Sequence, residues 1–297
     1  MNGRERGFLL LSSHLGEPER KPLTTAQLRT LADRVRWAQL PKEDRELEIR
    51  DLTELGYPSE MAKRIHQLLG EEDVLDYYLR KGEVLGCTPI TRVSDSYPFH
   101  LRKRLGLDSP GVLWTCGDMS LLEQPMVALV GSRELKEENW SFAAEVGRQA
   151  AQQGYVLVSG NARGADRTAQ ESCLAAGGRV ICVVADALWK QPLREGVLYI
   201  SENDFEETFS AQRAISRNRV IHGMGLKTFV AQSSLRTGGT WDGTVKNLRH
   251  GWSHVYGFAD GSEAMEELAQ LGACLIGTEA LSSIYDLPIK EDNLFDR

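Results

Sequence analysis

The sequence predicts an α/β protein, in which an extended Rossmann-like parallel-sheet domain is preceded by a small all-helical domain. Three observations lead to this prediction. At 297 residues, the chain is long enough for two domains. Its first 84 residues have helical periodicity and no strand-like alternation. From residue 126 onward, apolar runs alternate with helical segments, and each run is hydrophobic throughout, which is typical of strands in a parallel sheet covered on both faces.

The N-terminal domain, residues 1–84, is expected to contain short helices arranged in a SAM or helix-hairpin-helix-like manner. After an N-cap at Thr24 or Thr25, apolar residues recur at near-helical spacing, namely Leu28, Leu31, Val35 and Leu40. A second helical segment breaks at Gly56 and Pro58 and resumes with Met61, Ile65, Leu68 and Leu69. This domain is either a packing or dimerisation module, or a nucleic-acid contact made through the turn near Gly56.

Residues 85–125 contain four of the ten prolines and predict an irregular connector that packs on the next domain. The Rossmann-like domain is expected over residues 126–285, with strands near 126–131, 155–160, 179–185, 227–234 and 253–258. Helices are expected near 138–154 and 165–178. Residues 286–297 are interpreted as an acidic C-terminal tail.

Composition excludes several classes of protein. The longest apolar runs are far shorter than the roughly 18 residues that a membrane-spanning helix needs, and the N-terminus lacks the apolar core of a signal peptide. Five cysteines are scattered without a C-x-x-C pair, so neither a disulfide framework nor a metal site is expected. We therefore expect a cytoplasmic protein with reduced thiols and no membrane contact.

Charge is distributed unevenly along the chain. The net charge of -7 argues against nucleic acid as a partner, because phosphate binding depends on Lys and Arg. However, residues 159–254 hold twelve Lys and Arg against nine Asp and Glu, whereas residues 260–297 hold two against nine. The excess of positive charge thus lies within the predicted Rossmann-like domain, and the acidic residues follow it.

Glycine-rich turns follow the first two predicted strands of that domain. In the first turn, Gly131 allows the chain to turn closely, the hydroxyl of Ser132 can contact an anion, and Arg133 is expected to project its guanidinium over the sheet edge. In the second turn, backbone N–H groups and a helix N-terminus predict a cradle for phosphate, formed by Ser159, Gly160, Arg163 and Gly164. Asp166 is interpreted as a carboxylate of the first helical turn rather than a catalytic group.

Two further segments are expected at the same edge of the sheet. Arg217, Asn218 and Arg219 immediately precede a segment that should be buried, so these charges favour an anionic ligand. Gly238 and Gly239 form a flexible turn after a later strand, and nearby Trp241 is interpreted as a core residue. There is neither a G-x-G-x-x-G fingerprint nor a P-loop, so no nicotinamide or ATP site and no other cofactor is expected.

At these places together the sequence resembles the DNA-processing protein A family, the DprA/Smf proteins. The resemblance covers roughly residues 87–276 and runs, in family order, through "YPFHLRKRLGLDSPGVLWTCGDMSLL", "VALVGSRE", "SGNARGADRTAQESCLAAGG", "SRNRVIHG" and "SSLRTGGT". It implies a homodimer that binds single-stranded DNA in a basic pocket and loads a RecA-type recombinase during DNA recombination and natural transformation. Carried over by motif, the pocket residues are Arg133, Ser159, Gly160, Arg163, Gly164, Arg217, Asn218 and Arg219.

The chain departs from the family pattern in ways that suggest a diverged member without the C-terminal winged-helix domain. Residues 189–200 are shorter than the family's loop at this place, and the family's S-G-S-L-x-T turn is replaced by "TGGTWDGT". Two other functions therefore stay open. One is a regulatory or antitoxin protein that binds a toxin in a phage-defence pair, and the other is a nucleotide-binding or nucleotide-hydrolysing protein. Because Asn247 stands where a phosphoribohydrolase would have its catalytic glutamate, we expect that the chain is not an enzyme.

Overall fold

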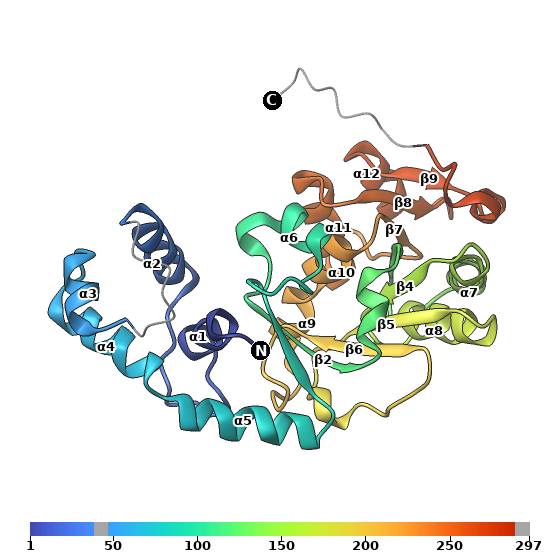
Figure 1. Ribbon diagram of the computed structural model, residues 1–297. Coiled ribbons are helices and arrows are strands. Elements are labelled where there is room, and N and C mark those ends of the chain that lie inside the picture. The colour runs from blue at the N-terminus through green and yellow to red at the C-terminus, as the bar shows by residue number, and fades with distance from the viewer. Residues whose placement is uncertain (39–46, 289–297) are drawn as a thin grey trace. The chain divides into compact units, whose positions relative to one another are not determined.

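The computed structural model describes residues 1–38 and 47–288, which form two compact units (Figure 1). The first unit comprises Met1–Tyr97, Pro110–Trp114 and Glu202–Glu207. The second comprises Pro98–Ser109, Thr115–Ser201 and the chain from Thr208 onward. Leu40 and residues 289–297 of the predicted acidic tail lie outside the described residues.

The first unit is mainly helical. Its elements are α1 (Gly3–Ser12), α2 (Thr25–Trp37), α3 (Ile49–Glu54), α4 (Ser59–Leu69), α5 (Glu72–Val84) and the strand β1 (Thr88–Thr91). Thr24 is the N-cap of α2, as its hydroxyl accepts from the N–H of Gln27 and the Gln27 side chain accepts in return, forming a capping box. The core of this unit contains Leu31, Leu52 and Ile65. These residues come from three different helices, so the helical periodicity read from the sequence marks the faces that pack together.

The turn near Gly56 is held by α2. Gly56 has a φ of 84°, and Pro58 precedes the first residue of α4. The guanidinium of Arg34 lies 4.2 Å from the centre of the Tyr57 ring, and its Nη1 donates to the carbonyl of Leu55. One arginine of α2 therefore fixes the connection between α3 and α4.

The second unit is an α/β domain, which confirms the predicted fold class. Its strands are β3 (Met126–Val130), β4 (Val156–Ser159), β5 (Arg179–Val183), β6 (Val197–Ser201), β7 (Lys227–Val230), β8 (His254–Phe258) and β9 (Cys274–Ile276), and β2 (Val112–Gly117) ends in it. The strand order of the whole sheet is β1-β2-β6-β5-β4-β3-β7-β8-β9. From β6 through to β9, neighbouring strands run parallel.

Helices cover both faces of this sheet. Its helices are α6 (Phe99–Leu105), α7 (Glu137–Gln152), α8 (Ala165–Ala175), α9 (Ala211–Ser216), α10 (Asn218–Met224), α11 (Gly238–His250) and α12 (Glu263–Gln270). Short 3-10 turns are η1 (Gly106–Asp108), η2 (Met119–Glu123), η3 (Leu188–Lys190) and η4 (Thr278–Ser283). Helices α7 and α8 pack side by side on one face, and α10 and α11 lie together on the other (Figure 1). The strands between them are buried throughout, as the continuous apolar runs predict.

Four strands were not predicted from the sequence, namely β1, β2, β6 and β9. The connector expected to be irregular contains β1, α6 and β2, and β6 begins within residues 189–200, which were interpreted as a shortened loop. The residues of β6 are all buried, because the strand is inserted between β2 and β5. These strands are short, and their pairing depends on neighbours that are distant in the sequence, which a local pattern does not specify.

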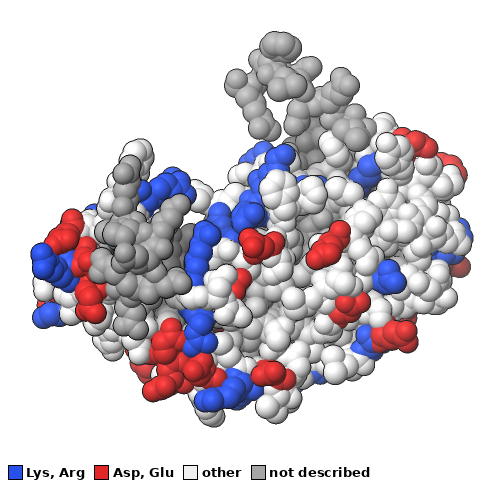
Figure 2. Space-filling model, viewed as in Figure 1, with Lys and Arg blue, Asp and Glu red and all other residues white. Residues whose placement is uncertain are grey.

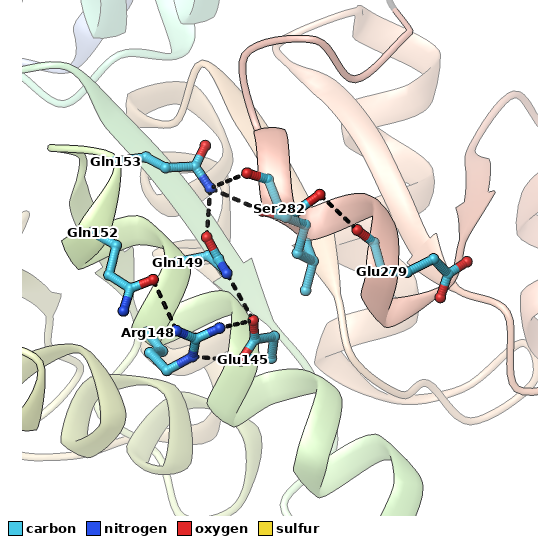
Figure 3. Close-up of polar contacts among 8 residues, drawn as sticks. Glu145, Arg148, Gln149, Gln152, Gln153, Glu279 and Ser282 are labelled. Carbon is cyan, nitrogen blue, oxygen red and sulfur yellow. Dashed lines mark hydrogen bonds and ion pairs between the residues drawn. The ribbon is translucent and has the colours of Figure 1, made fainter.

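Hydrogen bonds from Gln153, at the end of α7, and from Lys227 of β7 hold the C-terminal part of the described chain. The side chain of Gln153 donates to the carbonyl of Leu281 (2.8 Å) and accepts from the N–H of Ile284 (2.7 Å). It also donates to Gln149, which in turn donates to Glu145 one turn earlier in α7 (Figure 3). Buried Lys227 donates to the carbonyls of Ile284 and Tyr285. These contacts satisfy backbone groups that η4 leaves unpaired.

All five cysteines are free thiols. Within residues 1–38 and 47–288, no helix combines the length and apolar character that would let it cross a membrane.

Candidate nucleic-acid interface

A cavity of about 800 Å³ opens at the carboxyl ends of β3, β4 and β7. Strand β3 lies between β4 and β7, so the chain continues toward β5 and β6 on one side and toward β8 and β9 on the other. Such a reversal of strand order leaves a crevice at the strand ends, where ligands of parallel sheets bind. The cavity lies entirely within the second unit.

Eight of the twelve candidate residues line this cavity. They are Gly131, Ser132, Arg133, Arg163, Arg217, Asn218, Gly238 and Gly239. The remaining four do not line it, namely Ser159, Gly160, Gly164 and Arg219. The structure thus brings together residues from all four turns that the sequence singled out.

The loop after β3 is held by a residue that sequence reasoning missed. Gln232 follows β7, and its backbone carbonyl accepts from the N–H of Ser132 (2.9 Å). Its side chain accepts from the N–H of Lys136 (3.0 Å) and donates to the carbonyl of Glu134 (3.2 Å). Gln232 therefore fixes the loop that presents the exposed side chain of Arg133. The only sequence signal for it is its position directly after a buried strand.

Asp166 organises the second turn. Its Oδ2 accepts from the N–H groups of Gly160 (3.1 Å) and Ala162 (3.2 Å), and lies 3.9 Å from the Nη2 of Arg217. Burial raises the pKa of Asp166, whereas Arg217 and the two backbone N–H groups act to lower it. The carboxylate thus holds the loop and a guanidinium in place, which is a positioning role.

Two glycines of this turn are required by close approach rather than by contact with the cavity. A Cβ on Gly160 would overlap the guanidinium of Arg217, which donates to the Gly160 carbonyl at 3.0 Å. Gly164 has a φ of 82°, and a Cβ there would overlap the backbone of Arg133. Ser159 is fully buried and accepts from the side chain of Gln170. Gly160, Gly164 and Ser159 therefore do not line the cavity but hold the backbone and side chains that do.

The third turn separates two arginines. Arg217 is the last residue before α10, and its buried side chain lines the cavity. Asn218 donates to the carbonyl of Gly239 (2.9 Å), which joins α10 to the start of α11. Arg219 instead donates to the carbonyls of Asp108 (2.9 Å) and Ser216 (2.7 Å). The side chain of Arg219 is thus engaged outside the cavity.

Charges at the rim are mixed. The exposed side chains of Arg163 and Glu134 form an ion pair at 3.4 Å. Outside the cavity, Lys and Arg also gather over α6, whose last turn contains Arg102, Lys103 and Arg104 (Figure 2). Positive charge in this unit is therefore not limited to the cavity.

The residues near the fourth turn are part of the core. Trp241 is buried, as expected from the sequence. Asn247 is fully buried and donates to the Nδ1 of His222 (3.0 Å) and the Oγ of Ser253 (2.9 Å). Among the described residues, no group of three or more His, Cys, Asp or Glu side chains is arranged to hold a metal ion.

The family of the chain follows from its match to known proteins. The family model described as DNA recombination-mediator protein A matches residues 88–251, which is more than half of the chain. The chain belongs to this family. The match includes β3, β4, β7 and all the residues that line the cavity, and it confirms the resemblance to the DprA/Smf proteins.

Curated members of the family are distant relatives. The DNA processing protein DprA of Streptococcus pneumoniae is 29% identical over 197 residues, which cover 62% of this chain and 69% of that protein. DprA of Bacillus subtilis is 28% identical over 176 residues, covering 56% of this chain and 57% of that protein. The chain therefore spans a little over half the length of the Bacillus relative.

Solved structures show the same fold. The X-ray structure of S. pneumoniae DprA superimposes with a TM-score of 0.71 at 21% identity, covering 97% of this chain and 99% of that one. DNA processing protein A of Helicobacter pylori, known for a unique single-stranded DNA binding mode, gives a TM-score of 0.55 at 19% identity, covering 66% and 94%. At these identities the likeness concerns the fold alone.

Proposed function

We propose that the chain binds single-stranded DNA by its phosphate backbone in the cavity at the ends of β3, β4 and β7. The observation that carries this proposal is the convergence of three guanidiniums, from Arg133, Arg163 and Arg217, on one cavity. Each comes from a different turn of the chain. Guanidiniums are suited to phosphate because their planar N–H donors match its oxygens.

The arrangement favours binding with little choice of base sequence. Arg217 is held by Asp166 and the Gly160 carbonyl. The side chains of Arg133 and Arg163 are exposed, and the ion pair that Arg163 makes with Glu134 lies at the surface, so both arginines can follow the path of a strand. Contacts to phosphates position a nucleic acid but do not read its bases. A role in DNA recombination and transformation agrees with the family to which the chain belongs.

The hydrogen bonds of two polar side chains, Asp166 and Asn247, support a binding protein rather than an enzyme. Asp166 is committed to two backbone N–H groups and to Arg217, and Asn247 is committed to His222 and Ser253. Acid–base catalysis needs a group that reaches the reacting atoms, and these two polar side chains are engaged in the protein itself. We infer that the chain acts as a mediator in the cytoplasm, as a homodimer and with a RecA-type recombinase as its partner.

Fluorescence anisotropy of a labelled oligothymidine tests the proposal. The unmodified protein should bind it more tightly than a duplex of the same length, and Arg133→Ala should weaken this binding about ten-fold. Arg249→Ala is the matched control, because Arg249 is exposed on α11 and does not line the cavity. The proposal is wrong if the protein fails to bind at low salt, or if both variants behave alike while their melting curves match the unmodified protein.

A further inference from the structure

Three exposed apolar side chains lie in segments that adjoin the cavity. Trp189 is 43% exposed in η3, Phe209 is 54% exposed just before α9, and Ile215 is 44% exposed at the end of α9. Ile215 lines the cavity itself. Large apolar side chains grouped on a surface indicate a binding partner.

Hydrogen bonds join the segment that carries Trp189 to the turn after β4 and to the segment that carries Phe209. On one side, Asn161 donates to the side chain of Gln191 (3.3 Å), which joins the arginine-bearing second turn to η3. On the other side, the N–H of Phe209 donates to Asp186 (3.1 Å), which also accepts from Ala187 at the start of η3 (2.8 Å). The three apolar side chains thus belong to segments that adjoin one another and the cavity.

The backbone that bears both rings is fixed. The N–H of Lys190 and the side chain of Gln191 both donate to the carbonyl of Ala187, closing the turn that carries Trp189. Phe209 precedes Ser210, whose hydroxyl caps α9 by accepting from the N–H of Arg213. An exposed ring on a rigid backbone loses little conformational entropy when it binds a ligand.

The charges beside the rings favour nucleic acid as the occupant. The ammonium of Lys190 lies 5.5 Å from the centre of the Trp189 ring, and exposed Arg163 follows Asn161 in the adjoining turn. A single strand presents an aromatic base and a phosphate in every nucleotide, so aromatic rings beside cations match its repeating chemistry. A hydrophobic protein partner would use the rings but would have no need of the cations.

We propose that Trp189, Phe209 and Ile215 form a stacking surface for the bases of a single strand whose phosphates enter the cavity. This inference rests on the proposed function and extends it from the phosphates to the bases. Stacking on an aromatic ring accepts any base, because every base has a π-face. The surface thus adds affinity without reading sequence.

The test compares a labelled oligothymidine with a strand of the same length in which abasic sites replace the central thymidines. The unmodified protein should bind the abasic strand roughly five-fold or more weakly, because the phosphates remain and the bases are missing. Trp189→Ala and Phe209→Ala should each weaken binding of oligothymidine by a similar factor, with little effect on the abasic strand. Trp189→Phe should retain most of the affinity.

Trp140→Ala is the matched control, because Trp140 is 55% exposed on α7 and does not line the cavity. The inference is overturned if the unmodified protein binds both strands equally, or if the Trp189 and Phe209 variants behave like the Trp140 variant. The comparison of strands needs no variant, so it holds even if a variant folds poorly. If the unmodified protein binds neither strand, the proposed function itself fails.

Discussion

At the scale of single residues, three groups near the cavity depend on one another. Asp166 holds the backbone of Gly160 and Ala162, and the guanidinium of Arg217 lies between Asp166 and the Gly160 carbonyl. Both charged side chains are buried, so each would be costly without its partner. The absence of a side chain at residue 160 is what allows the guanidinium to lie against the backbone.

Replacing Gly160 by Ala should therefore displace Arg217. The added Cβ would overlap the guanidinium, so the bond to the Gly160 carbonyl would be lost. We expect the free energy of unfolding to fall by about 1.5–3 kcal/mol, the usual worth of a hydrogen bond to a charged group. Affinity for oligothymidine should fall as well. Urea unfolding and anisotropy measure the two effects.

Gly70→Ala provides the comparison for this variant. Gly70 has a φ of -77°, and a Cβ there would make only ordinary contacts at 3.5 Å and beyond. Its replacement should change stability little. An unchanged affinity for Gly160→Ala would contradict the placement of Arg217 as a phosphate ligand.

At the scale of elements, a buried polar network joins α10, α11 and β7. His222 of α10 accepts from Asn247 of α11, which also bonds Ser253, and Ser253 in turn bonds Thr228 of β7 (2.7 Å). Burial lowers the pKa of His222 to about 3. The folded protein therefore keeps this imidazole neutral, whereas the unfolded chain binds a proton near the usual pKa of about 6.5.

This difference predicts a loss of stability in mild acid. Between pH 6.5 and 3 the unfolded chain binds the proton and the folded chain does not, so the free energy of unfolding falls as the pH falls. From pH 7 to pH 5, His222 should contribute a loss of about 2 kcal/mol. Urea unfolding at pH 7 and pH 5 measures this loss. The free energy of unfolding of His222→Gln should fall by about 2 kcal/mol less between these pH values than that of the unmodified protein.

The comparison between variants isolates His222 from other groups. Burial raises the pKa of Asp166, which changes stability with pH in the opposite direction. His100→Gln is the control variant, because His100 is exposed on α6 and takes no part in the buried network of His222. If the His222 and His100 variants lose equal stability in acid, His222 is not the responsible group.

At the scale of the whole molecule, the net charge of -7 is a poor guide to the cavity. Three arginines converge there although acidic residues outnumber basic ones in the chain. The attraction between a ligand and this cavity depends on the nearest charges. Charges that lie farther away than roughly 10 Å are largely screened by salt. The protein can therefore attract a polyanion locally while it is acidic overall.

The salt dependence of binding should show how many phosphates these three arginines neutralise. If each neutralises one phosphate of a single strand, the logarithm of the binding constant should fall with the logarithm of salt concentration with a slope of roughly -2. Arg163→Ala should reduce the size of this slope by about 0.7, whereas Arg249→Ala should not change it. A slope near zero would mean that phosphate contacts do not drive binding. Anisotropy across a salt series measures it.

Local patterns in the sequence were sufficient for the class of fold and for the position of the cavity. Continuous apolar runs followed by glycine-rich turns predicted β3 and β4, and the carboxyl ends of parallel strands necessarily meet at one edge of a sheet. The same reasoning brought Arg133, Arg163 and Arg217 together. These features depend on periodicity and strand direction, which a sequence carries by itself.

Tertiary structure decided where individual side chains point and what holds them. Arg217 and Arg219 are two residues apart, yet one lines the cavity and the other bonds the carbonyl of Asp108. Gln232 and Trp189 showed no pattern in the sequence, because their roles come from bonds to distant loops and from the exposure of a ring. Such properties arise only when segments far apart in the chain pack together, since local sequence does not specify which distant backbone groups become neighbours.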